Sequence, residues 1–209
     1  VEGFVKSLKP KSKGKSIKLR DYQIDAVEYA LKSHRALLVS PTASGKSLII
    51  YSLVRYYKMM ELKTLILVPT TSLVEQMYSD FEDYSMKDDS FHTDEWCRKI
   101  HGGMEKGTIL ERVVISTWQS IYKKPAQFFQ HFGMVIGDEA HQFKAKSLTS
   151  IMEKCTEAEY RIGTTGTLDG TQTHQLVLEG LFGPVKKVTT TKDLIDSDPV
   201  SYTHLTLPT

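Results

Sequence analysis

Short apolar runs alternate with longer segments of helical periodicity along most of this 209-residue chain. The apolar runs predict strands at residues 36–39, 64–68, 97–100, 113–116, 134–138 and 160–163. Segments with apolar residues on one face predict helices at residues 21–32, 46–60, 72–84, 147–154 and 173–180. The strand runs are continuously apolar, which is typical of strands that are covered on both faces. The pattern therefore predicts an α/β fold with a mainly parallel sheet and helices on both faces.

Composition adds a few limits to this picture. The net charge is only +2, without the excess of basic residues that is typical of a dedicated nucleic-acid-binding domain. No run of 18 or more apolar residues occurs in the sequence, so we expect no membrane partner. The two cysteines, Cys97 and Cys155, are too few for a disulfide framework and predict reduced thiols in a cytoplasmic protein.

The first candidate for chemistry follows the predicted strand at residues 36–39. Gly45, Lys46 and Ser47 form the end of a phosphate-binding loop at the start of a helix. We expect Lys46 to reach the β- and γ-phosphates of ATP and the Ser47 hydroxyl to ligate Mg²⁺. The loop amides would also face the phosphates, and these loop residues are Thr42, Ala43 and Ser44. Ser40 stands where the strict motif has glycine. A second Gly-Lys-Ser tripeptide, at residues 14–16, follows no apolar strand, so we interpret it as unrelated to nucleotide binding.

The second candidate is acidic and ends the predicted strand at residues 134–138. Asp138, at a strand end, can hold Mg²⁺ through water. Glu139 is expected to orient or activate the water that attacks the γ-phosphate. Nothing nearby supplies further ligands for a zinc site, so we interpret His141 as a coupling residue. The two motifs supply complementary parts of one Mg-ATP site, with Lys46, Asp138 and Glu139 as its catalytic residues.

Together, the residues Asp-Glu-Ala-His at 138–141 and Gly-Lys-Ser at 45–47 resemble the DEAH-box type of superfamily 2 helicases. Further segments fall in the order of that family's motifs, at residues 19–23, 68–76, 116–120 and 163–167. The residues of these motifs, together with residues 132–133 and 181–184, are most similar to the UvsW group of helicases from T-even bacteriophages. The resemblance covers residues 18–195 and implies the first RecA-like P-loop domain of such a helicase.

The resemblance also implies roles for individual residues. Arg20 and Gln23 would contact the nucleotide, with Gln23 reading adenine. His141 would couple hydrolysis to nucleic acid together with three small residues, which are Thr165, Gly166 and Thr167. Residues after three of the strands would grip backbone phosphates without reading bases. These residues are Pro69, Thr70, Thr71, Gly102, Ser116, Thr117 and Gln119. Helix capping by the hydroxyl residues among them is an alternative that is compatible with a phosphate contact.

A domain division follows from the same resemblance. We interpret residues 1–17 as a basic, flexible segment and residues 18–188 as the first RecA-like, ATP-binding helicase domain. Residues 189–199 would begin a linker to a missing second RecA-like domain, which would supply arginine residues to the transition state. The last ten residues, 200–209, match the translation of a common sequencing-library adapter, and we interpret them as non-native.

The function implied by the resemblance is that of the N-terminal motor domain of an ATP-dependent DNA helicase or translocase. Such motors remodel branched DNA, including replication forks and recombination intermediates, in the cytoplasm of a bacterium or a phage-infected host. Alone, the chain is expected to bind ATP and Mg²⁺ with little activity. Two alternatives stay open: the translocase subunit of a restriction enzyme, and a P-loop NTPase that is not a helicase. The residues alone do not separate single-stranded DNA, branched DNA and RNA as the partner.

Overall fold

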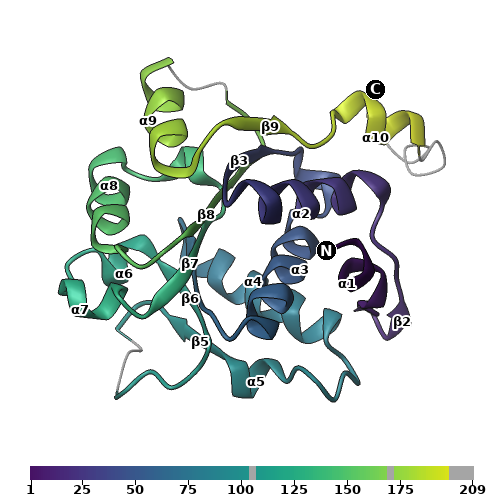
Figure 1. Ribbon diagram of the computed structural model, residues 1–209, viewed down its shortest axis with the longest axis horizontal. Helices are drawn as coiled ribbons and strands as arrows, with labels where there is room; N and C mark the ends of the chain where they lie inside the picture. The colour runs from purple at the N-terminus through teal and green to yellow at the C-terminus, as the bar shows by residue number, and fades with distance from the viewer. Residues whose placement is uncertain (104–106, 169–171, 198–209) are drawn as a thin grey trace, which may run out of the picture.

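A parallel sheet forms the centre of the molecule in the computed structural model, which describes residues 1–103, 107–168 and 172–197 (Figure 1). Within these ranges the sheet has seven strands in the order β5-β6-β4-β7-β8-β3-β9. The strands are β3 (Arg35–Val39), β4 (Lys63–Val68), β5 (Cys97–Ile100), β6 (Val113–Thr117), β7 (Phe132–Gly137), β8 (Tyr160–Thr165) and β9 (Val185–Lys187). Every neighbouring pair is parallel, so the predicted sheet is confirmed.

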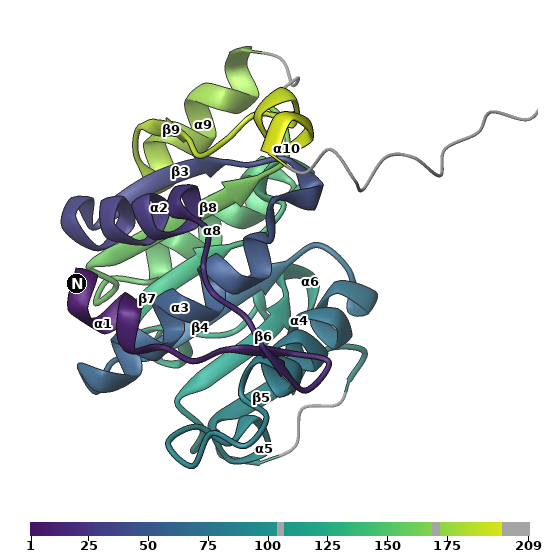
Figure 2. The same ribbon diagram turned by 90° about the vertical axis from the view of Figure 1, so that its right-hand side faces the viewer.

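Helices cover both faces of this sheet, as predicted (Figure 2). One face carries α2 (Asp21–Ser33), α3 (Lys46–Met59) and α4 (Thr71–Tyr84). The other carries α6 (Trp118–Ile121), α7 (Ala126–Phe129), α8 (Ala145–Lys154) and α9 (Gln172–Phe182). The remaining helices are α1 (Glu2–Ser7), α5 (Thr93–Trp96) and α10 (Thr191–Ser197), with 3₁₀ turns η1 (Thr42–Ser44) and η2 (Ala140–Gln142).

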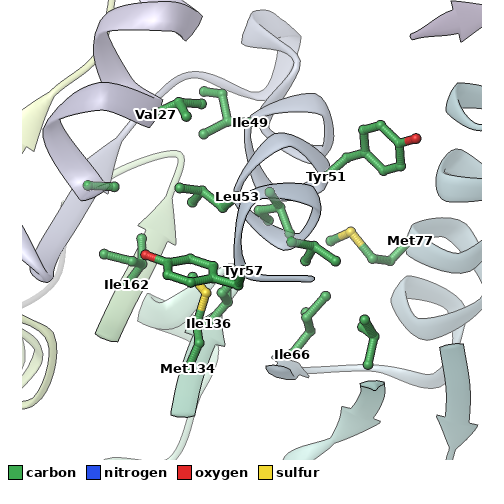
Figure 3. Close-up of a cluster of buried hydrophobic side chains, with 14 of the residues drawn as sticks. Val27, Ile49, Tyr51, Leu53, Tyr57, Ile66, Met77, Met134, Ile136 and Ile162 are labelled. Atoms are coloured by element: carbon green, nitrogen blue, oxygen red, sulfur yellow. The ribbon is translucent and has the colours of Figure 1, made fainter. Parts of the chain in front are cut away.

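Strand side chains alternate between the two layers, because successive residues of a strand point to opposite faces. Leu65 and Leu67 of β4 therefore pack with α6 to α9, while Ile66 packs with α3 and α4. Figure 3 shows part of the layer that contains α3, in which Leu53 and Tyr57 lie against the sheet. This double burial explains why the strands read as continuous apolar runs.

The N-terminal segment differs from the expectation of a flexible arm. Residues 1–17 contain α1 and a hairpin of β1 (Lys11–Ser12) and β2 (Lys15–Ser16). Val5 is only 3% exposed, and the Phe4 ring packs edge-on against Tyr56. Lys13 and Gly14 both have positive φ angles, the combination that suits a two-residue hairpin turn. The second Gly-Lys-Ser tripeptide is therefore part of a hairpin, in agreement with its interpretation as unrelated to the nucleotide.

Most predicted elements correspond to observed ones within a few residues, but the edge strand β9 and the short helices were not predicted. Strand β9 has only three residues, and two of them are lysines, so it lacks the apolar pattern by which a strand is recognised in sequence. Residues 85–95, for which no strand or helix was predicted, contain the start of α5. The segment at residues 200–209, interpreted as adapter sequence, lies outside the described residues.

Cys97 and Cys155 are free thiols, and both are buried. No helix in the described ranges is long and apolar enough to cross a membrane.

All the candidate motifs lie at one edge of the sheet, since parallel strands have their carboxyl ends on the same side. The pairing also extends past the strand ends. The Ser40 amide donates to the Thr165 carbonyl over 2.9 Å, and the Asp138 amide donates to the Leu67 carbonyl over 2.9 Å. The phosphate-binding loop is thereby anchored to the end of β8, and the acidic motif to the end of β4. In the strand order, β8 lies between β7, which leads to the acidic motif, and β3, which leads to the loop.

Candidate functional site

The phosphate-binding loop connects β3 to α3 through one tight turn, η1. Gly45 follows this turn with a φ of 74°, in the left-handed region that favours glycine. A Cβ at this position would lie 2.5 Å from Nε2 of Gln23, so a side chain would also clash. The first amides of α3 have no carbonyl partner within the helix, which leaves them available to a phosphate.

Ser40, the departure from the strict motif, has a structural role in this loop. Its hydroxyl donates to the Ser44 hydroxyl over 2.5 Å, and Ser44 donates to the Pro41 carbonyl over 2.6 Å. Both serine side chains are buried. These hydrogen bonds tie the two ends of η1 together, so the loop is held in shape without the missing glycine.

Lys46 and Glu139, two of the three expected catalytic residues, form a direct ion pair. Lys46 is only 7% exposed, and Glu139 has a φ of 50°, an uncommon conformation for a residue with a side chain. Such backbone strain persists only where the surroundings fix it, and it is found preferentially at functional sites. Because Lys46 already pairs with Glu139, a phosphate group that binds Lys46 would have to compete with the Glu139 carboxylate.

Asp138, the third expected catalytic residue, lies directly behind this pair. Its Oδ1 accepts hydrogen bonds from the Thr164 hydroxyl at 2.6 Å and from the Glu139 amide at 2.9 Å. Burial raises the pKa of Asp138, while the Thr164 hydrogen bond and the Lys46 charge oppose that rise. A cation near Asp138 would favour its ionised form further.

The expected coupling residues also come together. Nδ1 of His141 lies 2.5 Å from the Thr165 hydroxyl, which donates its hydrogen to the Thr167 carbonyl over 2.7 Å. Because the hydroxyl has one hydrogen, His141 must donate from Nδ1 to Thr165. Gly166 leaves room beside Lys46, whose Nζ would be 3.7 Å from a Cβ at that position. The acidic motif and the end of β8 are thus connected by hydrogen bonds.

On the other side of the loop, the first turn of α2 supports the backbone of Ser44. Nε2 of Gln23 and the Tyr22 hydroxyl both donate to the Ser44 carbonyl over 2.9 Å. Oε1 of Gln23 accepts from the Arg20 amide over 2.9 Å. Gln23 is buried, so in this conformation its amide group holds the loop in place. Its contact with adenine stays a proposal.

Two clefts meet at Ala43, one on each side of the loop. The larger has a volume of about 650 Å³ and is lined by Glu139, His141 and Gly166. The smaller has a volume of about 440 Å³ and is lined by Arg20 and the segment that follows it. Phosphate-binding amides between two clefts, the smaller of which is lined by the aromatic Tyr22 and Tyr84, fit a nucleoside triphosphate.

The residues present also fit a magnesium ion. Asp138 and Ser47 offer oxygen atoms, and Mg²⁺ is usually held by one or two carboxylates, water and substrate phosphates. In the ranges that the structure describes, no group of three or more histidine, cysteine or acidic side chains forms a metal cluster of its own. The Ser47 hydroxyl lies 2.8 Å from the Tyr84 hydroxyl, a contact that no motif indicated.

The candidate nucleic-acid residues lie at or just after the carboxyl ends of β4, β5 and β6, and they differ in accessibility. Thr70 and Thr71 are exposed, and Thr70 caps α4 by accepting from the Leu73 amide over 3.3 Å. Gly102 is exposed in the turn after β5. Gln119 is also exposed and donates to the Pro69 carbonyl over 3.2 Å, which joins two of the motifs.

Three members of this group, Pro69, Ser116 and Thr117, are buried in the described conformation. Ser116 is buried and donates its hydroxyl to the Thr117 carbonyl over 2.8 Å. The buried Thr117 hydroxyl pairs with that of Ser120 at 2.8 Å. Both hydroxyls therefore make local hydrogen bonds at the end of β6, although Thr117, the N-cap residue of α6, makes no side-chain capping hydrogen bond.

Sequence reasoning overlooked two side chains that the geometry brings to the site. Thr164 lies next to the expected Thr165, but it is Thr164 that bonds Asp138, since neighbouring residues of β8 point to opposite faces. Tyr84 lies at the end of α4, outside every motif that the sequence indicated. The alternation along β8 could have indicated Thr164, whereas nothing in the sequence indicated Tyr84.

A loop of the phosphate-binding type and an acidic motif at the carboxyl edge of a parallel sheet define a P-loop NTPase domain with a RecA-like fold. Residues 16–170 match the family model described as "Type III restriction enzyme, res subunit", so the chain belongs to this family of superfamily 2 helicase-type domains. This membership favours the helicase-type motor over a P-loop NTPase of another class.

Similar proteins agree with this assignment. The "ATP-dependent DNA helicase uvsW" of Enterobacteria phage T4 is 37% identical over 194 residues, which is 91% of this chain and 38% of that protein. The "DNA 3'-5' translocase XPB2" of Sulfurisphaera tokodaii is 31% identical over 169 residues, 81% of this chain and 35% of that protein. The crystal structure of T4 UvsW superposes with a TM-score of 0.81 at 37% identity, over 90% of this chain and 38% of that one. The chain thus spans under two fifths of the length of these curated relatives.

Proposed function

We propose that this chain is the nucleotide-binding part of an ATP-driven DNA helicase or translocase that remodels branched DNA. The observation that carries the proposal is the meeting of Lys46, Asp138 and Glu139 at the sheet edge that also presents Thr70 and Thr71. The UvsW and XPB2 relatives, which are named a DNA helicase and a DNA translocase, support the choice of DNA.

Each residue of the nucleotide site has a distinct task in this proposal. The α3 amides and Lys46 bind the phosphates, and Lys46 leaves Glu139 as it does so. The freed Glu139 carboxylate then orients water beside the γ-phosphate and can accept its proton. Asp138 and Ser47 would hold Mg²⁺, which neutralises charge on the phosphates when bound. His141 and Thr165 transmit the state of this site to the end of β8.

The nucleic-acid contact is proposed for the turns after β4 and β5. Exposed hydroxyls and helix N-termini can bind backbone phosphates without reading the bases. Thr70 and Thr71 at the start of α4 and Gly102 after β5 meet this description. Pro69 and Gln119 would support the contact by connecting the turns after β4 and β6.

A second domain would supply the remaining groups of the site. In related phosphoryl-transfer enzymes an added arginine increases the rate by about 10³-fold or more. We therefore expect the 209-residue chain to bind ATP and Mg²⁺ weakly, to hydrolyse ATP slowly and to unwind no DNA. Residues 18–188 would be the first motor domain, and residues 189–199 would begin the linker to the second.

The test measures binding of a fluorescent ATP analogue to the purified chain, alongside Lys46→Ala and the control Lys63→Ala. Lys63 begins β4 and so lies at the opposite edge of the sheet. Loss of binding in Lys46→Ala alone supports the site, and equal binding by both variants contradicts it. ATP hydrolysis by a protein that also contains the proposed second domain is then measured without nucleic acid and with single-stranded DNA, forked DNA, unbranched duplex DNA and RNA. Stimulation greatest with forks supports branched-DNA remodelling.

A restriction-enzyme translocase is the second candidate, because the matching family model carries that description. The same hydrolysis assay separates the two functions. Stimulation by unbranched duplex DNA that equals or exceeds stimulation by forks would favour the restriction translocase. Stimulation by RNA alone would contradict both DNA functions.

A further inference from the structure

Tyr84 places a phenol hydroxyl beside the phosphate-binding loop from a distant part of the chain. It is the last residue of α4, and its Oη lies 2.8 Å from Oγ of Ser47. The same side chain lines the smaller cleft together with Ser44 and Gly45. Tyr84 therefore reaches the site both through a cleft wall and through a hydrogen bond.

The Tyr84 side chain is held in this position from two sides. Its ring packs on that of Tyr51 from α3, with the ring centroids 5.4 Å apart. The preceding residue, Asp83, accepts a hydrogen bond from the Lys13 amide at the hairpin turn over 2.8 Å. Tyr51 is itself fixed, since its hydroxyl accepts from Arg55 over 2.6 Å. These contacts keep the Tyr84 hydroxyl at a defined place next to α3.

The hydrogen bond matters because of how serine ligates a cation. The oxygen gives a lone pair to the metal, so the hydroxyl hydrogen must point to another acceptor. A fixed acceptor orients the lone pair, and removing such outer partners of a metal site costs metal affinity. In the described part of the chain, the Tyr84 hydroxyl is the side-chain group that hydrogen-bonds the Ser47 hydroxyl.

We propose that Tyr84 is a positioning residue for the metal of the nucleotide site, acting through the hydroxyl of Ser47. The proposal rests on the proposed function, because it takes Ser47 as a ligand of Mg²⁺. It assigns the effect to the phenol oxygen and not to the aromatic ring. Tyr84→Phe separates the two, since phenylalanine keeps the ring that lines the cleft and loses only the hydroxyl.

The experiment compares the affinity of the chain for a fluorescent ATP analogue in excess Mg²⁺ and in EDTA. The ratio of the two affinities is the gain that the metal provides. Tyr84→Phe should lower this gain about tenfold, with affinity in EDTA unchanged. Ser47→Ala should lower the gain at least as much, and adding Tyr84→Phe to it should change nothing further, because both residues act through one oxygen.

Tyr78→Phe is the matched control, since it removes a hydroxyl from the same helix. The Tyr78 ring lies under Lys99, with Nζ 4.5 Å from its centroid, and this variant should keep the wild-type gain. An unchanged gain in Tyr84→Phe, or additive effects of Tyr84→Phe and Ser47→Ala, would overturn the proposal. So would an equal loss in Mg²⁺ and EDTA, which indicates a ring or folding effect. Wild-type binding by Lys46→Ala would instead refute the nucleotide site itself.

Discussion

Thr164 donates its hydroxyl hydrogen to Oδ1 of Asp138 over 2.6 Å, in a part of the site where both side chains are buried. This contact joins the end of β7 to the end of β8 at the point where the acidic motif begins. It also opposes the rise in the Asp138 pKa that burial causes. The carboxylate therefore depends on a threonine that lies outside the expected set of site residues.

Replacing Thr164 with valine should destabilise the folded chain. The side chain keeps its shape, but Asp138 loses a buried donor, which costs about 1–3 kcal/mol. Urea unfolding at neutral pH measures the loss in the free energy of unfolding. Thr164→Ser retains the hydroxyl and should recover most of it. If valine is as stable as threonine, the hydrogen bond has no net stabilising effect.

Glu139→Gln should bind ATP more tightly than the wild type while hydrolysing it more slowly. Lys46 no longer has to leave a carboxylate in order to meet phosphate, and loss of a general base lowers rates by about 10²–10⁴-fold. Equilibrium binding and single-turnover hydrolysis test the two effects separately. Glu153→Gln, an exposed position on α8, serves as the control. Weaker ATP binding by Glu139→Gln would contradict the competition between phosphate and Glu139.

Two glycine-to-alanine changes should move stability in opposite directions. A Cβ at Gly163 would lie 2.8 Å from Cδ1 of Leu37 and 2.8 Å from the Phe182 ring, so Gly163→Ala should destabilise the chain by about 1–3 kcal/mol. Gly180 lies in α9 with nothing within 4 Å of an added Cβ. Gly180→Ala should stabilise by about 0.5–1 kcal/mol, because alanine favours helix. Thermal unfolding of both variants tests the pair, and equal shifts would contradict it.

Tyr57→Phe should leave stability unchanged or raise it. The Tyr57 hydroxyl is the buried side-chain atom that lacks a hydrogen-bond partner among the described residues, and burial raises its pKa far above the usual value. Removing an unsatisfied polar group avoids a penalty of about 1–3 kcal/mol. Tyr51→Phe is the comparison, since it breaks a 2.6 Å bond from Arg55 and should destabilise. Thermal unfolding distinguishes them, and a clear loss in Tyr57→Phe would reveal a hidden partner.

Acid should weaken the contact between α3 and the loop that follows α4. Partial burial raises the pKa of Asp88, but hydrogen bonds from Ser90 and Arg55 and the Arg55 charge outweigh it, so the pKa lies below its usual value. A lowered folded-state pKa means that the stabilisation is present above the unfolded pKa, near 4, and is lost as pH falls through the folded value. The stability difference between wild type and Asp88→Asn should therefore shrink as pH falls below about 4. A constant difference in unfolding midpoints from pH 6 to 3 would contradict this.

Much of the nucleotide site was predictable from the sequence. Lys46 and Glu139 were assigned from two local patterns, each an apolar strand followed by characteristic residues, and the structure places them in contact. Local patterns suffice here because a parallel sheet brings the carboxyl ends of all its strands to one edge. The strands and the long helices could be predicted for a similar reason, since burial imposes a periodicity that is visible in the residues themselves.

Tertiary structure alone decided the partners of those residues. The Tyr84 contact with Ser47 depends on where the end of α4 lies against α3, and no periodicity encodes that placement. The regular structure of N-terminal residues 1–17 likewise depends on tertiary packing, because Val5 and Phe4 pack on helices that come later in the chain. Ser116 and Thr117 were expected to be surface hydroxyls, but they are the last residues of β6, pair with β4 and are buried. Sequence thus determined the sheet and its motifs, because these follow from local burial and chain direction. Only the fold fixed the hydrogen bonds around them, because they join side chains that meet through packing.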